Sequence, residues 1–137
     1  MAAVYEWYQR GMELLQAGDV HAAATLLERA AAVEPDKGSI REALARAYFG
    51  SRRFDAALTE FAAALDISPV NDYAHFGAGL CLARLGRFPE AVGHLRMANV
   101  MRPGNSDYEG ALARYEKWLE WTKGSDAGES SSQASGP

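Results

Sequence analysis

The residue types most often found in catalytic and metal sites are few in this sequence and are not grouped. None of its three histidines, His21, His75 and His94, stands three or four residues from another His or Cys, so their spacing does not predict a zinc site. The single cysteine, Cys81, lies in an apolar helical stretch and is interpreted as a buried structural thiol. The Gly77-Ala78-Gly79 segment lacks the preceding strand of a phosphate-binding loop. We therefore predict that the protein is not an enzyme, with no catalytic residue, metal or cofactor.

The composition narrows the class of protein further. The chain has 137 residues, 48% apolar and 23% charged, with a net charge of −4, which suits one compact domain or a short repeat array. Its Lys and Arg residues are not clustered, which argues against a nucleic-acid partner. The sequence shows no run of eighteen apolar residues and no signal pattern, so we expect no membrane contact. The lone thiol is typical of a reducing compartment, and we expect a cytoplasmic protein.

A repeat of 34 residues organises the sequence. Pro35, Pro69 and Pro103 follow one another at this interval, and equal intervals of this size are typical of a repeat array. Between the prolines, apolar residues recur three and four positions apart, as on one face of an α-helix. Five further sets of residues share the same register: Gly11, Ala45 and Gly79; Leu14, Tyr48 and Leu82; Ala23, Ala57 and Ala91; Leu27, Phe61 and Leu95; and Ala30, Ala64 and Ala98.

Each repeat is predicted to contain two helices. The first helices are expected near residues 4–17, 38–50 and 72–85, and the second helices near residues 20–33, 54–67 and 88–101. Turn-forming segments such as Gly18-Asp19 and Gly86-Arg87 separate the two helices of a unit. The prolines end the second helix, because proline lacks the amide hydrogen that continues the helical ladder. Gly or Ala at positions 11, 45 and 79 would let the paired backbones approach closely.

A seventh helix is expected over residues 106–122. Ser106 or Asn105 would supply its N-cap, and Glu109 would complete a capping box with Ser106. Its apolar stripe is spaced to cover the last repeat, and it contains Tyr108, Leu112, Tyr115 and Leu119. Such a helix is interpreted as a terminal cap, because an uncovered end would leave apolar surface in water. Residues 124–137 contain no large apolar side chain and are predicted to be disordered.

These features resemble the tetratricopeptide repeat (TPR) family. The similarity to its consensus rests on the second-helix opening Arg53-Phe54-Asp55-Ala56-Ala57 and on the string Trp7, Gly11, Leu14, Ala23, Leu27, Ala30 and Pro35. Arg41 and His75 depart from this consensus, since they stand where the first unit has Trp7. The excess of Arg over Lys, with abundant Ala and Gly, is typical of a GC-rich bacterial genome, so the chain resembles a small bacterial-type three-repeat member.

The resemblance covers residues 4–104 and implies an all-α fold. That fold is a right-handed superhelix, an α-solenoid of three helix-turn-helix TPR units plus a C-terminal capping helix. The units would occupy residues 4–37, 38–71 and 72–105 of a TPR domain over 4–122. Family membership implies binding rather than chemistry.

The resemblance also implies which side chains face the ligand, because first helices line a concave groove in this family. The candidates are Tyr5, Tyr8, Met12, Glu42, Arg46, Phe49, Tyr73, Phe76, Leu80, Arg84 and Arg114. Aromatic residues and Met are enriched at interface hot spots or adapt to them, and Arg pairs bidentately with carboxylates. We expect a protein or peptide partner with apolar or aromatic anchors and an acidic group. Alternatively, several aromatics, Tyr8 and Phe76 above all, pack between adjacent first helices.

One known ligand mode of the family is not expected here. The chaperone-binding TPR proteins hold a C-terminal carboxylate with Lys, Asn and Arg side chains on the groove face. The matching places in this chain are held by Tyr8, Met12, Ala43, Tyr73 and Gly77. The clamp is therefore absent, and heat-shock-chaperone tails are not the expected partners.

Two tryptophans in the last helix leave a choice open. Trp118 and Trp121 either form an apolar face for self-association or for the end of the ligand, or cover Met97 or Met101 as part of the cap. The first interpretation of the whole chain is a monomeric adaptor or scaffold that binds a peptide segment in its groove. The alternative is a small TPR chaperone for secretion or assembly, which holds a client protein and forms a homodimer.

Overall fold

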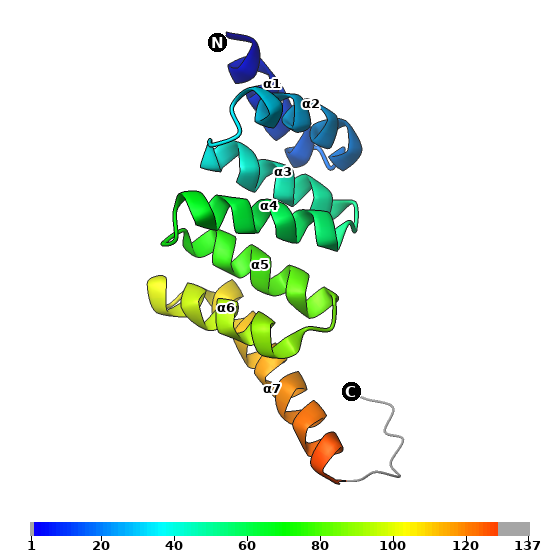
Figure 1. Ribbon diagram of the computed structural model, residues 1–137, viewed down its shortest axis with the longest axis vertical. Coiled ribbons are helices and arrows are strands. Elements are labelled where there is room, and N and C mark those ends of the chain that lie inside the picture. The colour runs from blue at the N-terminus through cyan, green and yellow to red at the C-terminus, as the bar shows by residue number, and fades with distance from the viewer. Residues whose placement is uncertain (1, 129–137) are drawn as a thin grey trace.

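The computed structural model describes residues 2–128, which form seven α-helices and no strand. The helices are α1 (Ala2–Gln16), α2 (Val20–Val33), α3 (Gly38–Gly50), α4 (Phe54–Ile67), α5 (Asp72–Arg84), α6 (Phe88–Met101) and α7 (Ser106–Gly128). They follow one another along the long axis of the molecule, from the N-terminus at one end to α7 at the other (Figure 1). The all-α repeat architecture predicted from the 34-residue period is confirmed.

The stack has two sides of different curvature. Each helix packs against the next one in the chain, and α1, α3, α5 and α7 also contact one another in turn, whereas α2, α4 and α6 do not. The first helices of the units therefore approach each other more closely than the second helices do. A stack of units curves toward the side on which its elements are closest, so the concave face belongs to α1, α3, α5 and α7.

The paired helices meet at positions where one side chain is missing or small. Ala23, Ala57 and Ala91 of the second helices have no exposed surface. A Cβ atom added at Gly79 would lie 2.7 Å from Cγ of Leu95, and one added at Gly77 would lie 2.3 Å from the Phe61 ring. Such distances leave no room for a side chain, so these glycines are required by close packing rather than by a turn.

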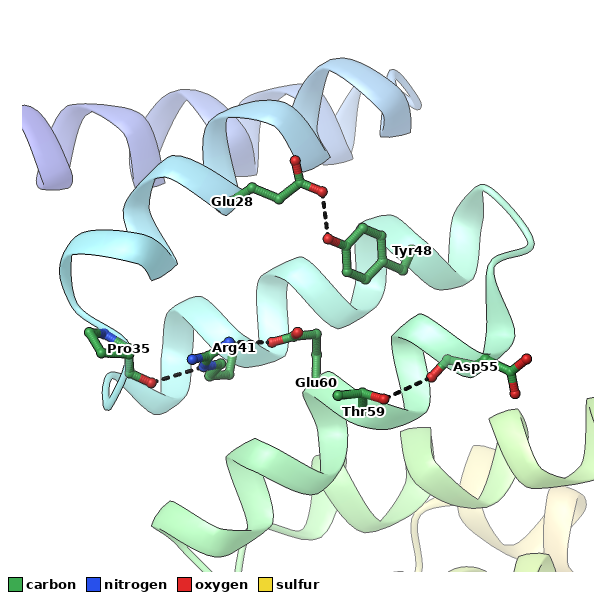
Figure 2. A network of polar contacts seen from close by, with 7 residues as sticks. All are labelled: Glu28, Pro35, Arg41, Tyr48, Asp55, Thr59 and Glu60. Carbon is green, nitrogen blue, oxygen red and sulfur yellow. Dashed lines mark hydrogen bonds and ion pairs between the residues drawn. The ribbon is translucent and has the colours of Figure 1, made fainter.

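Polar contacts join the helices of the second unit to each other and to the first (Figure 2). The Arg41 guanidinium of α3 donates to the carbonyl oxygen of Pro35 at 2.9 Å and lies 2.8 Å from the Glu60 carboxylate of α4. The Tyr48 hydroxyl donates to Glu28 of α2. Burial and this hydrogen bond raise the pKa of Tyr48 to about 12, so the phenol stays protonated and keeps donating.

Helix ends and turns follow the repeat register. Asn71 and Asn105 are N-caps, whose Oδ1 atoms accept from the amides of Ala74 at 2.9 Å and Tyr108 at 3.0 Å. Of the two cap candidates for α7, the structure therefore selects Asn105, and Ser106 is the first residue of the helix. The mid-unit turns place Gly18, Arg52 and Gly86 at φ values of 84°, 64° and 78°, a region that favours glycine.

The expected end of the seventh helix is wrong. α7 continues to Gly128 rather than stopping at residue 122, so residues 124–128 are helical and not disordered. No proline stands between Pro103 and Pro137, and a single glycine such as Gly124 costs a helix only about 1 kcal/mol relative to alanine. The remainder of the predicted disordered tail, residues 129–137, lies outside the described residues.

Candidate functional site

The concave face carries three sets of side chains spaced 34 residues apart on α1, α3, α5 and α7. Unlike the packed interior, these sets keep their residue type only between the first and third units and change it in the second unit and in α7. They are Tyr5, Ser39, Tyr73 and Asp107; Tyr8, Glu42, Phe76 and Gly110; and Met12, Arg46, Leu80 and Arg114. In these sets α1 and α5 carry aromatic and aliphatic side chains, whereas α3 and α7 carry polar, charged or glycine residues.

None of the predicted groove residues is sealed in the core. Tyr5 is 63% and Tyr73 is 36% exposed, Arg84 and Arg114 are exposed, and the others are half-buried. The aromatics nevertheless contact their neighbours, with ring centroids 6.2 Å apart for Tyr73 and Phe76 and 4.7 Å apart for Phe76 and Tyr108. These rings pack against adjacent helices on one side and keep part of their surface open on the other.

A first cavity of about 300 Å³ lies at the N-terminal end of the array. It brings together the predicted groove residues Tyr5 and Tyr8, and its other lining residues are Val4, Glu34, Lys37, Ser39 and Ile40. Lys37 lies 4.0 Å from Glu34, at the long limit for an ion pair. This cavity is predominantly apolar in its lining, with one cation and one carboxylate at its edge.

A second cavity, here called the middle cavity, has a volume of about 210 Å³. It brings together five predicted residues from α3 and α5: Arg46, Phe49, Tyr73, Phe76 and Leu80. The glycines Gly50 and Gly77 and the ring of Phe61 complete its lining. Burial raises the pKa of the Tyr73 phenol, partly offset by nearby Arg46, so this hydroxyl is a neutral donor at the edge of the cavity.

A third cavity, here called the C-terminal cavity, has a volume of about 390 Å³ and lies between α5 and α7. It contains Arg84 and Arg114 and shares three of its walls, Phe49, Phe76 and Leu80, with the middle cavity. Its remaining lining residues are Ser106, Asp107, Gly110, Ala111 and Tyr115. The two cavities are therefore neighbouring parts of one trough.

The trough contains three arginines. Arg46, Arg84 and Arg114 make no ion pair within 4.0 Å among the residues that the structure describes. The Arg84 guanidinium lies over the rings of Phe49 at 5.4 Å and Phe54 at 5.2 Å, which holds its position by cation–π attraction. Burial raises the pKa of the Glu42 carboxyl, while Arg46 acts in the opposite direction.

Two of the predicted groove residues do not line these cavities. Met12 packs against the hydrophobic core, and Glu42 stands beside Arg46 and Tyr73 without lining the middle cavity. The structure therefore gathers the aromatic residues and the arginines but leaves these two at the margin.

The tryptophans of α7 form an aromatic cluster with the start of α6. Trp118 stacks on Phe88 with centroids 5.6 Å apart, and Tyr115 stacks on the same ring at 6.1 Å. Trp121 meets Trp118 edge-on at 6.0 Å. Both indoles are half-buried. The stacking partner is thus Phe88, whereas Met97, one of the two predicted partners, is 45% exposed.

Sequence reasoning missed a histidine pair between α5 and α6. His75 Nδ1 and His94 Nδ1 are 3.1 Å apart, and His75 Nε2 lies 2.9 Å from the carbonyl oxygen of Pro69. Spacing within one helix could not reveal this contact. His75 and His94 occupy the places of Arg41 and Glu60 one repeat earlier, a pair that the structure also brings into contact.

The histidine pair and the cysteine belong to the residue types that a metal site needs. Among the described residues, no three His, Cys, Asp or Glu side chains converge as a metal site would require. Cys81 is buried, as predicted. Burial raises the pKa of its thiol to about 12, only partly offset by Arg84, so the reactive thiolate is disfavoured. Within residues 2–128, no helix has the length and apolar character needed to cross a membrane.

Comparison with known proteins places the chain in a family. The tetratricopeptide repeat profile matches residues 8–72 and again residues 42–106, and the chain belongs to the tetratricopeptide repeat family. It is 30% identical over 111 residues to mouse (Mus musculus) Superkiller complex protein 3, an alignment that covers 81% of this chain and 7% of that protein. The chain thus spans a small fraction of the length of this relative.

Solved structures share the fold at lower sequence identity. The first TPR domain of Spaghetti (RPAP3), bound to the HSP90 peptide SRMEEVD, superposes with a TM-score of 0.83 at 17% identity, covering 87% of this chain and 94% of that one. The type III secretion translocator chaperone SycD of Yersinia enterocolitica superposes with a TM-score of 0.74, also at 17% identity, covering 88% and 83%. At these identities the likeness establishes the fold.

Proposed function

We propose that this protein is a non-catalytic interaction module that binds a peptide segment of a partner protein in its concave groove. The observation that carries this proposal is the trough of α3, α5 and α7, where Phe49, Tyr73 and Phe76 remain accessible beside arginines without ion pairs. Accessible aromatic rings are enriched at interface hot spots, and arginines beside them can pair with a carboxylate of a partner. The role would be that of an adaptor or scaffold.

The partner that suits this surface has apolar or aromatic anchors and an acidic group. The anchors would fill the cavities between first helices, and Arg46, Arg84 or Arg114 would pair with the carboxylate. The buried thiol of Cys81 suits a reducing compartment, so we place this binding in the cytoplasm.

The RPAP3 domain with its HSP90 peptide supports peptide binding as an ability of this fold. The same ligand is not proposed here, because Tyr8, Met12, Ala43, Tyr73 and Gly77 stand where the carboxylate clamp of chaperone-binding relatives would be. We propose a different peptide, bound nearer to the C-terminal end of the groove.

A second candidate is a small TPR chaperone for secretion or assembly, which holds a client and forms a homodimer. The fold of SycD, named as a secretion chaperone, and the half-buried Trp118 and Trp121 of α7 support it. Sedimentation equilibrium of the native chain and of a Trp118→Ala, Trp121→Ala variant separates the two candidates. A dimer that dissociates in the variant favours the chaperone, and a monomer in both favours the adaptor.

The groove proposal is tested by affinity capture with matched variants. The Arg46→Glu, Tyr73→Ala variant changes the middle cavity. The Arg29→Glu, Ala62→Ser variant changes exposed positions on α2 and α4 that line none of the cavities described above. We expect the first variant to lose partners that the native protein and the second variant both retain. Identical partners for all three proteins would mean that the concave face is not the working surface.

A further inference from the structure

We propose that the middle and C-terminal cavities form one two-part peptide site, which selects a large apolar side chain within four residues of an Asp or Glu. This inference rests on the proposed groove function and specifies its ligand. It concerns a protein or peptide segment, bound by α3, α5 and α7 together.

The two cavities are placed to receive neighbouring side chains of one segment. Phe49, Phe76 and Leu80 line both, so a ligand that fills one cavity passes directly over the wall of the other. In an extended segment, residues two apart point to the same face, and in a helix residues three or four apart do so. Because the two cavities share walls, the nearest side chains on one face of the segment are the ones that reach both, and these lie two to four residues apart.

The middle cavity suits the apolar side chain. Its walls are mostly aromatic and aliphatic, and its lining contains one cation, Arg46, and no carboxylate. Its volume of about 210 Å³ exceeds the roughly 150 Å³ at which an apolar protein cavity admits a benzene molecule. A phenylalanine or leucine side chain fits this space and would complete the packing of Phe61, Tyr73 and Phe76.

The C-terminal cavity suits the carboxylate. It exists because Gly110 stands where Phe76 stands one repeat earlier, and a Cβ at Gly110 would meet no atom within 4 Å. Two arginines, Arg84 and Arg114, line this space, against one carboxylate, Asp107. The excess of positive charge favours an anionic group, and the guanidinium of Arg84, held over Phe49 and Phe54, is already ordered for bidentate pairing.

The experiment is selection from a random library of displayed twelve-residue peptides against four proteins. These are the native chain, Arg84→Gln with Arg114→Gln, Arg84→Lys, and Arg29→Gln as the matched control, because Arg29 is exposed and makes no ion pair among the described residues. Circular dichroism melting of each variant confirms that it folds. The strongest native-selected peptide is then resynthesised, and its affinity for all four proteins is measured by fluorescence anisotropy.

We expect native-selected peptides to contain Phe, Leu, Ile, Trp or Tyr within four residues of Asp or Glu. The double glutamine variant should keep the apolar preference, lose the acidic one, and bind the resynthesised peptide about ten- to hundredfold more weakly, the range for loss of charge-assisted hydrogen bonds. Arg84→Lys should lose affinity less than the double variant, since it keeps the charge without the bidentate fork. Arg29→Gln should match the native protein.

Three other outcomes contradict different parts of the account. Selected peptides that share an apolar residue without an acidic neighbour, or that keep the acidic preference in the double variant, overturn this inference and leave groove binding intact. A native protein that selects no peptide contradicts the groove proposal itself, and the inference falls with it.

Discussion

The interior between paired helices and the concave groove follow opposite rules, although the same 34-residue repeat builds both. In the interior, Gly11, Ala45 and Gly79 and then Leu27, Phe61 and Leu95 recur with little change. In the groove, the equivalent positions range from aromatic rings at Tyr8 and Phe76 to the carboxylate of Glu42 and the bare backbone of Gly110. Close packing in the interior allows only side chains of certain volumes. In the groove the side chains face solvent, so residues of many sizes and polarities can stand there. The residues that repeat therefore hold the fold, and those that vary are free to determine what it binds.

The sharpest test of this contrast compares two phenylalanines. Phe61 is 2% exposed in the interior, and Phe76 is half-buried in the groove. We expect Phe61→Ala to lower the free energy of unfolding by about 3–5 kcal/mol, and Phe76→Ala by about 1–2 kcal/mol, because less apolar surface is lost. Urea denaturation measures both. Equal losses would mean that Phe76 is a core residue and would remove the distinction between the regions.

The close approach at Gly79 is the next test. Gly79→Leu should destabilise the fold by about 1–3 kcal/mol, since its side chain would overlap Leu95 and the Ala91 carbonyl oxygen. The matched control is Gly93→Leu in α6, where a Cβ meets no atom within 4 Å. That substitution should stabilise by about 0.5–1 kcal/mol through helix propensity. Thermal denaturation that ranks the two variants in the opposite order would contradict the packing described for the interior.

A smaller effect is expected at the turn of the second unit, where the repeat departs from its own pattern. Arg52 adopts a φ of 64° at the place of Gly18 and Gly86. Arg52→Gly should stabilise the fold by about 0.5–1 kcal/mol, because the left-handed region is unfavourable for a residue with a Cβ. Arg53→Gly, at a φ of −95°, should bring no such gain. A stability gain for Arg53→Gly but not for Arg52→Gly would show that the strained backbone position is not Arg52.

The smallest effect is expected at His75 and His94, which stand where Arg41 and Glu60 stand one repeat earlier. Burial and His75 hold the pKa of His94 below its ordinary value, and Glu90 acts in the opposite direction. The unfolded chain therefore binds more protons just below the ordinary histidine pKa of about 6.5, so the free energy of unfolding falls as the pH falls through this value. Melting temperatures at pH 7.5 and 5.5 should differ less for His94→Gln than for the native protein. A His94→Gln variant that keeps the full native difference would contradict this assignment.

The sequence predicts the fold almost completely, because the interior is repetitive. Three copies of the same packing pattern locate α2, α3, α4 and α6 at both ends. The C-terminal end of α7 escaped prediction, since α7 continues beyond the length of α1, α3 and α5 and a Gly-Ser segment does not by itself stop a helix. The same logic applies to Asn105, whose role as a cap becomes plain when it is aligned with Asn71.

The groove could be predicted only in part. Helical spacing places Tyr5, Phe49 and Tyr73 on the first helices, and the structure shows them accessible. Spacing could not show that Met12 lines none of the cavities described above or that Arg84 rests on Phe49 and Phe54. These depend on side-chain conformations in neighbouring helices, and so does the pairing of His75 with His94. To predict a contact between two helices, one must know how they are aligned in space. The 34-residue period gives that alignment only for positions whose residues repeat.

The most direct test of the central claim is site-specific photocrosslinking with benzoylphenylalanine at one position at a time. Tyr73 represents the groove, and Ala62, exposed on α4, represents the opposite side of the same region. The account predicts that the probe at position 73 crosslinks to a partner protein and that the probe at position 62 does not. Crosslinks from position 62 with none from position 73 would contradict it and assign binding to the second helices.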